Sequence, residues 1–329
     1  MGEGRHGAKR SKLRKGEMMK IFYCADIHAA ETTFRKFTNA GKFYGADLVI
    51  YGGDFTGKMV VPIIKDSKGH YRCTYYGSTV VVKNESELPD LENTLRECGF
   101  YPVLFTEEEY DRLTESDADR IIKEQQIKIM DAWVRMADER FGKSGTPCVF
   151  IPGNDDDFFI DPLLEKTEFM INGDGKVTEA CGYEILSLSC GHPTVFKYPR
   201  DISEEELGKK IDDLAAQVKD MSKCIFNIHV PPYDTNCDQD VQYDENLNPI
   251  LDGGDLKTGP VGSKAVRQAI EKYQPLLSLH GHIHGSRGVS KVGRTLAVNP
   301  GSDYDSGMLR GAIIEIDASG GITYSLTSG

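Results

Sequence analysis

Six apolar runs of this 329-residue chain each end in a short polar motif. The runs are KIFYCAD, DLVIYGGD, CVFIPGND, KCIFNIHV, PLLSLHGH and TLAVNPG. Each run is short and apolar, which is typical of a buried strand. Segments with helical spacing lie between several of them, so the pattern predicts an α/β fold. Such folds place their ligand sites beyond the carboxyl ends of the strands, and we expect the motifs to converge at one edge of a sheet.

The side chains in these motifs are of the types that bind metal ions. Asp26 and His28 lie two residues apart, so on an extended strand they point to the same side and can hold one ion together. His282 and His284 repeat that spacing. Mixed oxygen and nitrogen ligands favour Mn, Fe or Zn over Ca or Mg. The ordered set predicts two divalent metal ions, held by Asp26, His28, Asp54, Asn154, His229, His282 and His284.

The order of the motifs resembles that of the calcineurin-like metallophosphoesterases, which is D-x-H, G-D, G-N-x-(D/E), H and G-H-x-H. The matching part of the chain runs from about Lys20 to the C-terminus. The resemblance implies a four-layer α/β/β/α sandwich of two mixed sheets flanked by helices. It also implies a first ion held by Asp26, His28, Asp54 and His284. One aspartate is then shared, because the implied ligands of the second ion are Asp54, Asn154, His229 and His282.

The same resemblance implies a phosphoesterase in which a hydroxide that bridges the two ions attacks phosphorus in line. The commonest third motif of that family is Gly-Asn-His, whose histidine contacts the phosphate. Asp155 replaces that histidine here, and Asp156 matches the acidic residue that orients it. We predict both as catalytic residues, because a carboxyl group with a raised pKa can act as a general acid. An ionised Asp155 would repel a phosphate dianion, so we expect a diester, or a substrate with a good leaving group, to be preferred.

Net charge, apolar run length and cysteine spacing limit the kinds of partner and compartment that we expect for the chain. Its formal net charge of −12 disfavours nucleic acid and anionic membrane surfaces as partners of the folded body. No apolar run approaches the ~18 residues that a membrane span needs. The eight cysteines show no C-x-x-C spacing and several lie in apolar runs, which indicates free thiols in a reducing cytoplasm. The partner that we expect is a small phosphate-ester substrate.

The chain divides into a tail and one large domain. Residues 1–17 are rich in Lys and Arg, and we interpret them as a flexible, solvated tail or as sequence upstream of a start at Met18 or Met19. An arm that contacts RNA or a partner is the alternative. Residues 18–329 form the predicted metallophosphoesterase domain, with an insertion over about 57–145 and a long polar loop over about 231–262. The insertion is interpreted as a β-hairpin followed by a helix, and it can serve as a lid or as the contact of a homodimer.

A second class of function is compatible with the same motifs. A protein of this fold that has lost turnover can serve as a binding scaffold, and the replacement at Asp155 is a change of the kind that would begin such a loss. A scaffold under no catalytic demand is expected to lack some metal ligands. Because every inferred ligand is present, we favour a metal-dependent phosphoesterase. The sequence points to no particular substrate and does not choose among Mn, Fe and Zn.

Overall fold

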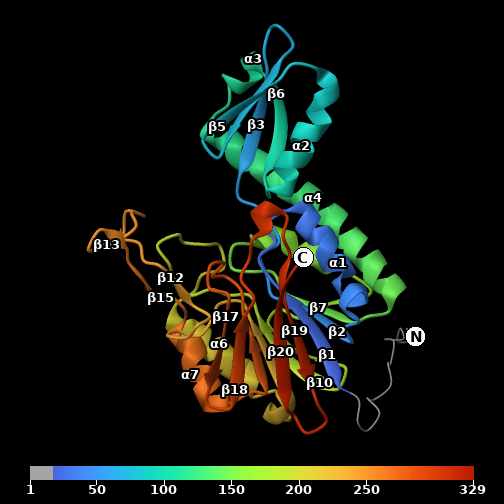
Figure 1. The fold of residues 1–329 in the computed structure, drawn as a ribbon, viewed down its shortest axis with the longest axis vertical. Coiled ribbons are helices and arrows are strands. Elements are labelled where there is room, and N and C mark those ends of the chain that lie inside the picture. Colours follow the sequence, from blue (N-terminus) through green and yellow to red (C-terminus); the bar gives the residue numbers. More distant parts are fainter. Residues whose placement is uncertain (1–17) are drawn as a thin grey trace.

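Two stacked six-stranded sheets form the centre of the molecule (Figure 1). The computed structural model describes residues 18–329, so the predicted basic tail lies outside the described residues. The first sheet contains, in spatial order, β20 (Ile322–Ser328), β19 (Arg310–Ile316), β1 (Met19–Cys24), β2 (Leu48–Tyr51), β7 (Cys148–Phe150) and β8 (Met170–Asn172). The second contains β17 (Gly288–Val292), β18 (Thr295–Asn299), β16 (Leu277–Leu279), β11 (Cys224–Ile228), β10 (Tyr183–Leu188) and β9 (Lys176–Ala180). Both sheets are mixed, since β1 and β10 each have one parallel and one antiparallel neighbour.

Helices cover the outer face of each sheet. The first sheet packs against α1 (Glu31–Tyr44) and α4 (Glu115–Ser144), where the rings of Phe34 and Trp133 stack with centroids 3.9 Å apart. The second sheet packs against α6 (Glu204–Ala215) and α7 (Lys264–Tyr273). A third apolar cluster, made by the strands alone, fills the space between the sheets. These three interfaces confirm the predicted four-layer α/β/β/α sandwich.

The segment between β2 and β7 forms a separate lobe at one end of the molecule, at the top of Figure 1. It contains a four-stranded sheet in the order β5 (Ser78–Val82), β4 (Tyr71–Tyr75), β3 (Val60–Lys65) and β6 (Tyr101–Thr106). Helix α2 (Leu88–Glu97) connects β5 to β6 and closes a small core of its own. The lobe also contains η1 (Glu85–Glu87), α3 (Glu107–Tyr110) and the beginning of α4, which Thr114 caps.

The segment between β11 and α7 forms an arm that projects from the side of the sandwich, on the left of Figure 1. Its base is the pair β12 (Gln239–Val241) and β15 (Thr258–Pro260), and its tip is the pair β13 (Leu251–Asp252) and β14 (Asp255–Leu256). Short helical turns complete the fold, namely η2 (Phe158–Ile160), α5 (Asp161–Leu164), η3 (Met221–Lys223) and η4 (Tyr304–Ser306). Among residues 18–329, no helix combines the length and the apolar character that crossing a membrane requires.

The strand directions place the polar motifs together. Strands β1, β2 and β7 are parallel to one another in the first sheet, and β11, β16 and β18 are parallel in the second. Their carboxyl ends therefore meet at one edge of each sheet. Because the two sheets are stacked, the motifs that follow these strands face one another across that end of the sandwich.

Candidate metal centre

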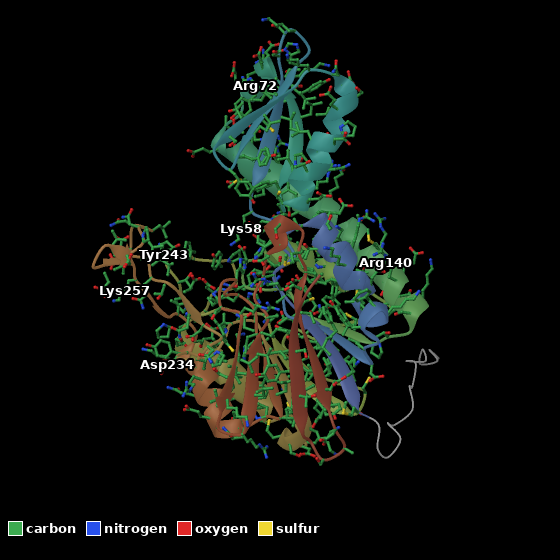
Figure 2. All side chains as sticks on the ribbon, in the orientation of Figure 1. Lys58, Arg72, Arg140, Asp234, Tyr243 and Lys257 are labelled. Carbon is green, nitrogen blue, oxygen red and sulfur yellow. The ribbon has the colours of Figure 1, made fainter. Side chains whose placement is uncertain are left out.

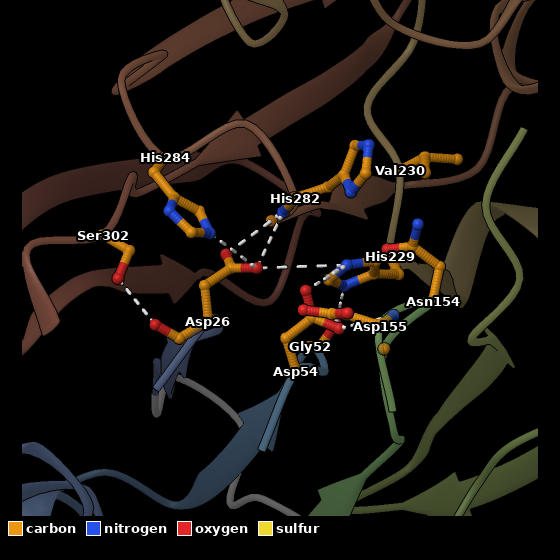
Figure 3. Close-up of polar contacts among 12 residues, drawn as sticks. Asp26, Gly52, Asp54, Asn154, Asp155, His229, Val230, His282, His284 and Ser302 are labelled. Atoms are coloured by element: carbon orange, nitrogen blue, oxygen red, sulfur yellow. Dashed lines mark hydrogen bonds and ion pairs between the residues drawn. The ribbon is translucent and has the colours of Figure 1, made fainter. Parts of the chain in front are cut away.

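The carboxylates and imidazoles of the motifs converge in two separate groups and a third that overlaps both (Figure 3). Asp26, His28 and His284 form one group, and Asp54, His229 and His282 form the other, each with ligand atoms within 4.8 Å of one another. The overlapping group consists of His28, Asp54 and Asp155. Asp54 connects the groups, because its Oδ2 lies 3.5 Å from His28 Nε2 and 3.3 Å from His229 Nε2. Both groups are positioned to hold metal ions.

The backbone explains how short loops aim these side chains inward. Strand β1 ends at Cys24, so Asp26 and His28 are not on an extended strand, and the predicted reason for their common direction was wrong. Asp26, His28, Asp54 and His282 instead adopt left-handed backbone conformations, with φ of 57°, 43°, 60° and 67°. Such conformations are strained for non-glycine residues and gather at functional sites.

Hydrogen bonds to main-chain carbonyls orient two of the imidazoles. His28 Nδ1 lies 3.1 Å from the carbonyl oxygen of Thr56, and His229 Nδ1 lies 2.7 Å from that of Gly52. Because a carbonyl only accepts, Nδ1 carries a proton in both rings, which leaves Nε2 as the nitrogen that can bind a metal ion. His229 Nε2 lies 3.3 Å from Asp54 Oδ2 and has no hydrogen-bond partner among residues 18–329, and His28 Nε2 lies 3.0 Å from His284 Nε2. A cation bound to these nitrogen atoms would satisfy them.

The buried side-chain amide oxygen of Asn154 has no hydrogen-bond partner among the described residues. The Asn154 Nδ2 donates a hydrogen bond of 2.7 Å to Asp201 Oδ1, which fixes the amide, while Oδ1 has no hydrogen-bond partner. The next residue, Asp155, donates its backbone N–H to Asp54 Oδ1 at 3.1 Å, which places the loop that carries Asn154 beside the second group. A buried unpaired carbonyl oxygen is costly in a folded protein, and a metal ion would remove that cost. The donor set therefore fits the predicted cation.

Burial and neighbouring charges shift the pKa values of the candidate ligands. Burial raises the pKa of Asp26 and lowers the pKa of His28 to about 3. Burial opposes ionisation of Asp54 as well, but the nearby charge of His229 holds the pKa of that carboxyl below its ordinary value. Although burial opposes protonation of His229, Asp54 and Asp26 raise the pKa of that imidazole to about 9. A histidine binds a metal ion in its neutral form, so metal binding at His229 would release a proton.

Sequence reasoning missed Lys58, which lies at the centre beside Asp155. Its Nζ lies 2.5 Å from Asp155 Oδ2 and 4.2 Å from the centroid of the Tyr198 ring. Burial lowers the pKa of Lys58. Figure 2 labels Lys58 between the upper lobe and the body of the molecule. The only signal in the sequence is its position four residues after Asp54, which does not by itself indicate a functional lysine.

The structure places Asp156 in a different role from Asp155. The Asp156 carboxylate is buried and accepts hydrogen bonds from Phe55 N at 3.0 Å, Thr56 N at 2.8 Å, Thr56 Oγ1 at 2.7 Å and Gly153 N at 2.9 Å. These bonds join the loop after β2 to the loop after β7. Asp156 is therefore a positioning residue whose oxygens are already used, whereas Asp155 contacts the Lys58 ammonium.

The Asp156→Ala variant is expected to lose about 3 kcal/mol or more of unfolding free energy, because the four donors lose a charged acceptor and stay buried. Urea denaturation measures this loss. Asp157→Ala is the matched control, since the Asp157 carboxylate accepts one bond of 3.3 Å from Phe159 N. Equal losses in the two variants would show that Asp156 does not hold the loops together.

Three residues outside these groups hydrogen-bond to the backbone of the turns that carry the candidate ligands. Asn299, at the end of β18, donates from Nδ2 to the carbonyl oxygens of Gly281 at 3.1 Å and Ile283 at 3.0 Å, which holds the turn that carries the two histidines. Ser302 donates to the carbonyl oxygen of Asp26 at 2.6 Å (Figure 3), and Tyr51 donates to that of Asp54 at 2.9 Å. These contacts hold strained loops in place, as preorganised metal sites require.

A cavity of about 980 Å³ opens onto the centre. His28, Asp54, His282 and His284 line one side of it, together with Lys58. Residues 192–198, which follow β10, and residues at the base of the arm also line it. A volume of this size is typical of sites for small molecules.

Comparison with known proteins supports the fold. No family model matches the chain. The uncharacterized protein MJ1162 of Methanocaldococcus jannaschii is 31% identical over 152 residues, which are 46% of this chain and 62% of that protein. The chain thus matches less than two thirds of the length of this curated relative. The crystal structure of TT1561 of Thermus thermophilus has a TM-score of 0.52 at 13% identity, covering 94% of this chain and 99% of that chain.

A third similarity is too weak to support a conclusion. A structure described as a novel archaeal phosphodiesterase is 12% identical and covers 94% of this chain and 100% of that chain, with a TM-score of 0.33. The similarity to TT1561 establishes a shared α/β architecture and no more, because sequence identity is low. Function must therefore be argued from the residues of the centre.

Proposed function

We propose that the protein is a metal-dependent phosphoesterase of the calcineurin-like type that prefers phosphodiesters. The observation that carries the proposal is the position of Asp54 between two groups of mostly buried carboxylates and imidazoles at the wall of a cavity. His229 Nε2 and Asn154 Oδ1 have no hydrogen-bond partner among residues 18–329, which supports a cation at the second group rather than a hydrogen-bonded polar core. The order of motifs that resembles this family supports the same reading.

In this proposal Asp26, His28, Asp54 and His284 hold one ion, and Asp54, Asn154, His229 and His282 hold the other. Mn, Fe or Zn bound there would supply Lewis acidity toward phosphate oxygens and lower the pKa of a coordinated water. The protein itself binds and orients the ester, excludes bulk water with the cavity walls, and holds the ligands in their strained loops.

Lys58 and Asp155 account for the proposed preference among substrates. The Lys58 ammonium lines the cavity and can donate a hydrogen bond to a phosphate oxygen. The Asp155 carboxylate partly compensates that positive charge, because the two groups form an ion pair. A dianionic monoester therefore meets less attraction here than beside an unpaired cation, while a monoanionic diester is less affected. Asp155 also holds Lys58 in one position, which makes it a positioning residue for that ammonium.

Hydrolysis of a nitrophenyl phosphodiester and of the matching monoester tests the proposal. We would supply Mn²⁺, Fe²⁺ and Zn²⁺ separately and measure bound metal in each sample. Metal-dependent turnover with faster diester hydrolysis is the expected result. Bound metal at two per chain without hydrolysis of either ester would overturn the proposal and favour a binding scaffold.

The Lys58→Met variant is expected to lower kcat/KM for the diester about tenfold to a hundredfold, because a charged hydrogen bond to the phosphate is lost. Metal content should stay unchanged, since Lys58 binds no ion in the proposal. Lys65→Met, which removes an exposed lysine on β3 that lies 4.0 Å from Glu85, is the control and should match the wild type. Equal kcat/KM in Lys58→Met and wild type would remove Lys58 from the site.

We further propose a reducing compartment such as the cytoplasm, and a small phosphate ester rather than nucleic acid as substrate. Cys24, Cys148 and Cys224 are free thiols buried within strands, which supports the first point. Cys237 is also buried, with its Sγ near the carbonyl oxygens of Gly288 and Ala297. The acidic charge of the chain supports the second point.

A further inference from the structure

Three aromatic side chains line the cavity beside the candidate metal ligands. Phe196 and Tyr198 come from the loop after β10, and Tyr243 comes from the arm, directly after β12. We call Phe196, Tyr198 and Tyr243 the aromatic wall. Phe196 and Tyr243 are 46% and 39% exposed, and neither belongs to a hydrophobic core cluster of the described residues. Their packing therefore does not account for their position, whereas a ligand in the cavity would.

The rings of the aromatic wall lead away from the metal centre in an unbroken series. Tyr198 meets the His282 ring edge-on, with centroids 6.2 Å apart and planes at 85°. Phe196 stacks beside Tyr198 at 5.9 Å and 23°, and Tyr243 meets Phe196 at 5.5 Å and 71°. A substrate with phosphorus at the metal centre would thus extend along Tyr198 and reach the corner formed by Phe196 and Tyr243.

Polar groups accompany the outer part of the wall. Asp240, Gln242 and Glu245 line the same cavity beside Tyr243, and they can accept hydrogen bonds from hydroxyl or amino groups. Figure 2 labels Tyr243 on the side of the arm that leads toward the body. A matching molecule has a planar ring with polar edges for the aromatic wall and the polar groups beside it, and a phosphate for the metal centre. Carbons that carry hydroxyl groups would join the ring to the phosphate.

We propose that the substrate is a phosphoester of a nucleoside, with its base against Phe196 and Tyr243 and its phosphate at the metal centre. This inference rests on the proposed function. Aromatic side chains bind nucleobases through stacking that tolerates any base, so the wall selects for a base without choosing one. The arm contributes the carboxylates of Asp240 and Glu245 to the cavity lining, which disfavours a polynucleotide and favours a single nucleotide unit.

The test compares two diesters that differ only in the base. One is adenosine 5′-(methyl phosphate), and the other is methyl riboside 5-(methyl phosphate), in which a methoxy group replaces adenine. The wild type is expected to show at least about tenfold higher kcat/KM for the adenosine ester. Phe196→Leu and Tyr243→Leu should each bring that ratio toward one. Tyr324→Leu, which removes a 49% exposed tyrosine on β20, is the control and should leave the ratio unchanged.

Calorimetric titration with adenosine supplies a readout that does not depend on turnover. Binding to the wild type that weakens about tenfold in Phe196→Leu supports the aromatic wall as a nucleoside site. A ratio near one together with no adenosine binding overturns the inference, while hydrolysis of both esters leaves the proposed function standing. Adenosine binding without hydrolysis of either ester would overturn the proposed function and retain the nucleoside site.

Discussion

The Asp54→Asn variant is expected to lose at least about a thousandfold in kcat for diester hydrolysis. Asp54 Oδ2 lies within 3.5 Å of the Nε2 atoms of both His28 and His229, one from each group of ligands. The amide has nearly the same shape but no charge, so the shared position between two dications loses its negative group. Metal content should fall together with activity, because both ions depend on this carboxylate.

Metal analysis and rates measured on the same preparation check this expectation. Asp317→Asn is the control, because Asp317 lies in the exposed turn between β19 and β20, beside the amino end of β1 rather than its carboxyl end. Thermal unfolding of Asp54→Asn shows whether the variant is folded. A folded Asp54→Asn protein that retains two ions and more than about a tenth of the wild-type rate would contradict a shared carboxylate.

The Gly153→Ala variant is expected to lose both stability and metal binding. An added Cβ would lie 1.9 Å from Asp54 Oδ1 and 2.4 Å from Asp54 N, which is closer than any non-bonded contact allows. Asp54 sits in a strained loop held by Asp156, so neither side can move away without breaking hydrogen bonds. We expect about 3 kcal/mol or more of lost unfolding free energy and a decrease in metal affinity of at least about a hundredfold.

Gly285→Ala is the matched control for this prediction. Gly285 directly follows a metal-binding histidine, as Gly153 directly precedes Asn154, but a Cβ there would meet no atom within 4 Å. Denaturant titration and calorimetric metal titration of both variants give the two quantities. Similar behaviour of the two alanine variants would mean that the close approach of Gly153 to Asp54 is not required.

Much of the fold was predictable because its signal is local. Each of the six apolar runs contains a strand, from β1 to β18. Short buried strands alternating with amphipathic helices have few alternative arrangements, and parallel strands bring their carboxyl ends to one side. The four-layer sandwich followed from the resemblance of the motifs, and the three apolar interfaces confirm it.

The insertion was predicted less well, for a physical reason. The sequence indicated a β-hairpin followed by a helix, and the structure does pair β3 with β4 through Ile64 and Lys65. The longer pairing of β3 is parallel and joins it to β6, beyond α2. Parallel pairing depends on contacts between segments far apart in the chain, which local periodicity does not report.

The sequence by itself determined which side chains stand beyond the carboxyl ends of the strands, because apolar runs and the polar residues after them are local features. Only the tertiary structure decided how those side chains are used. It brings His28 and His284, 256 residues apart, to a separation of 3.0 Å between their Nε2 atoms, and it directs Asp156 into the loops. It also adds Lys58 and the aromatic wall. These outcomes depend on left-handed loop conformations and on the stacking of two sheets. Neither feature can be predicted from the spacing of residues along one strand.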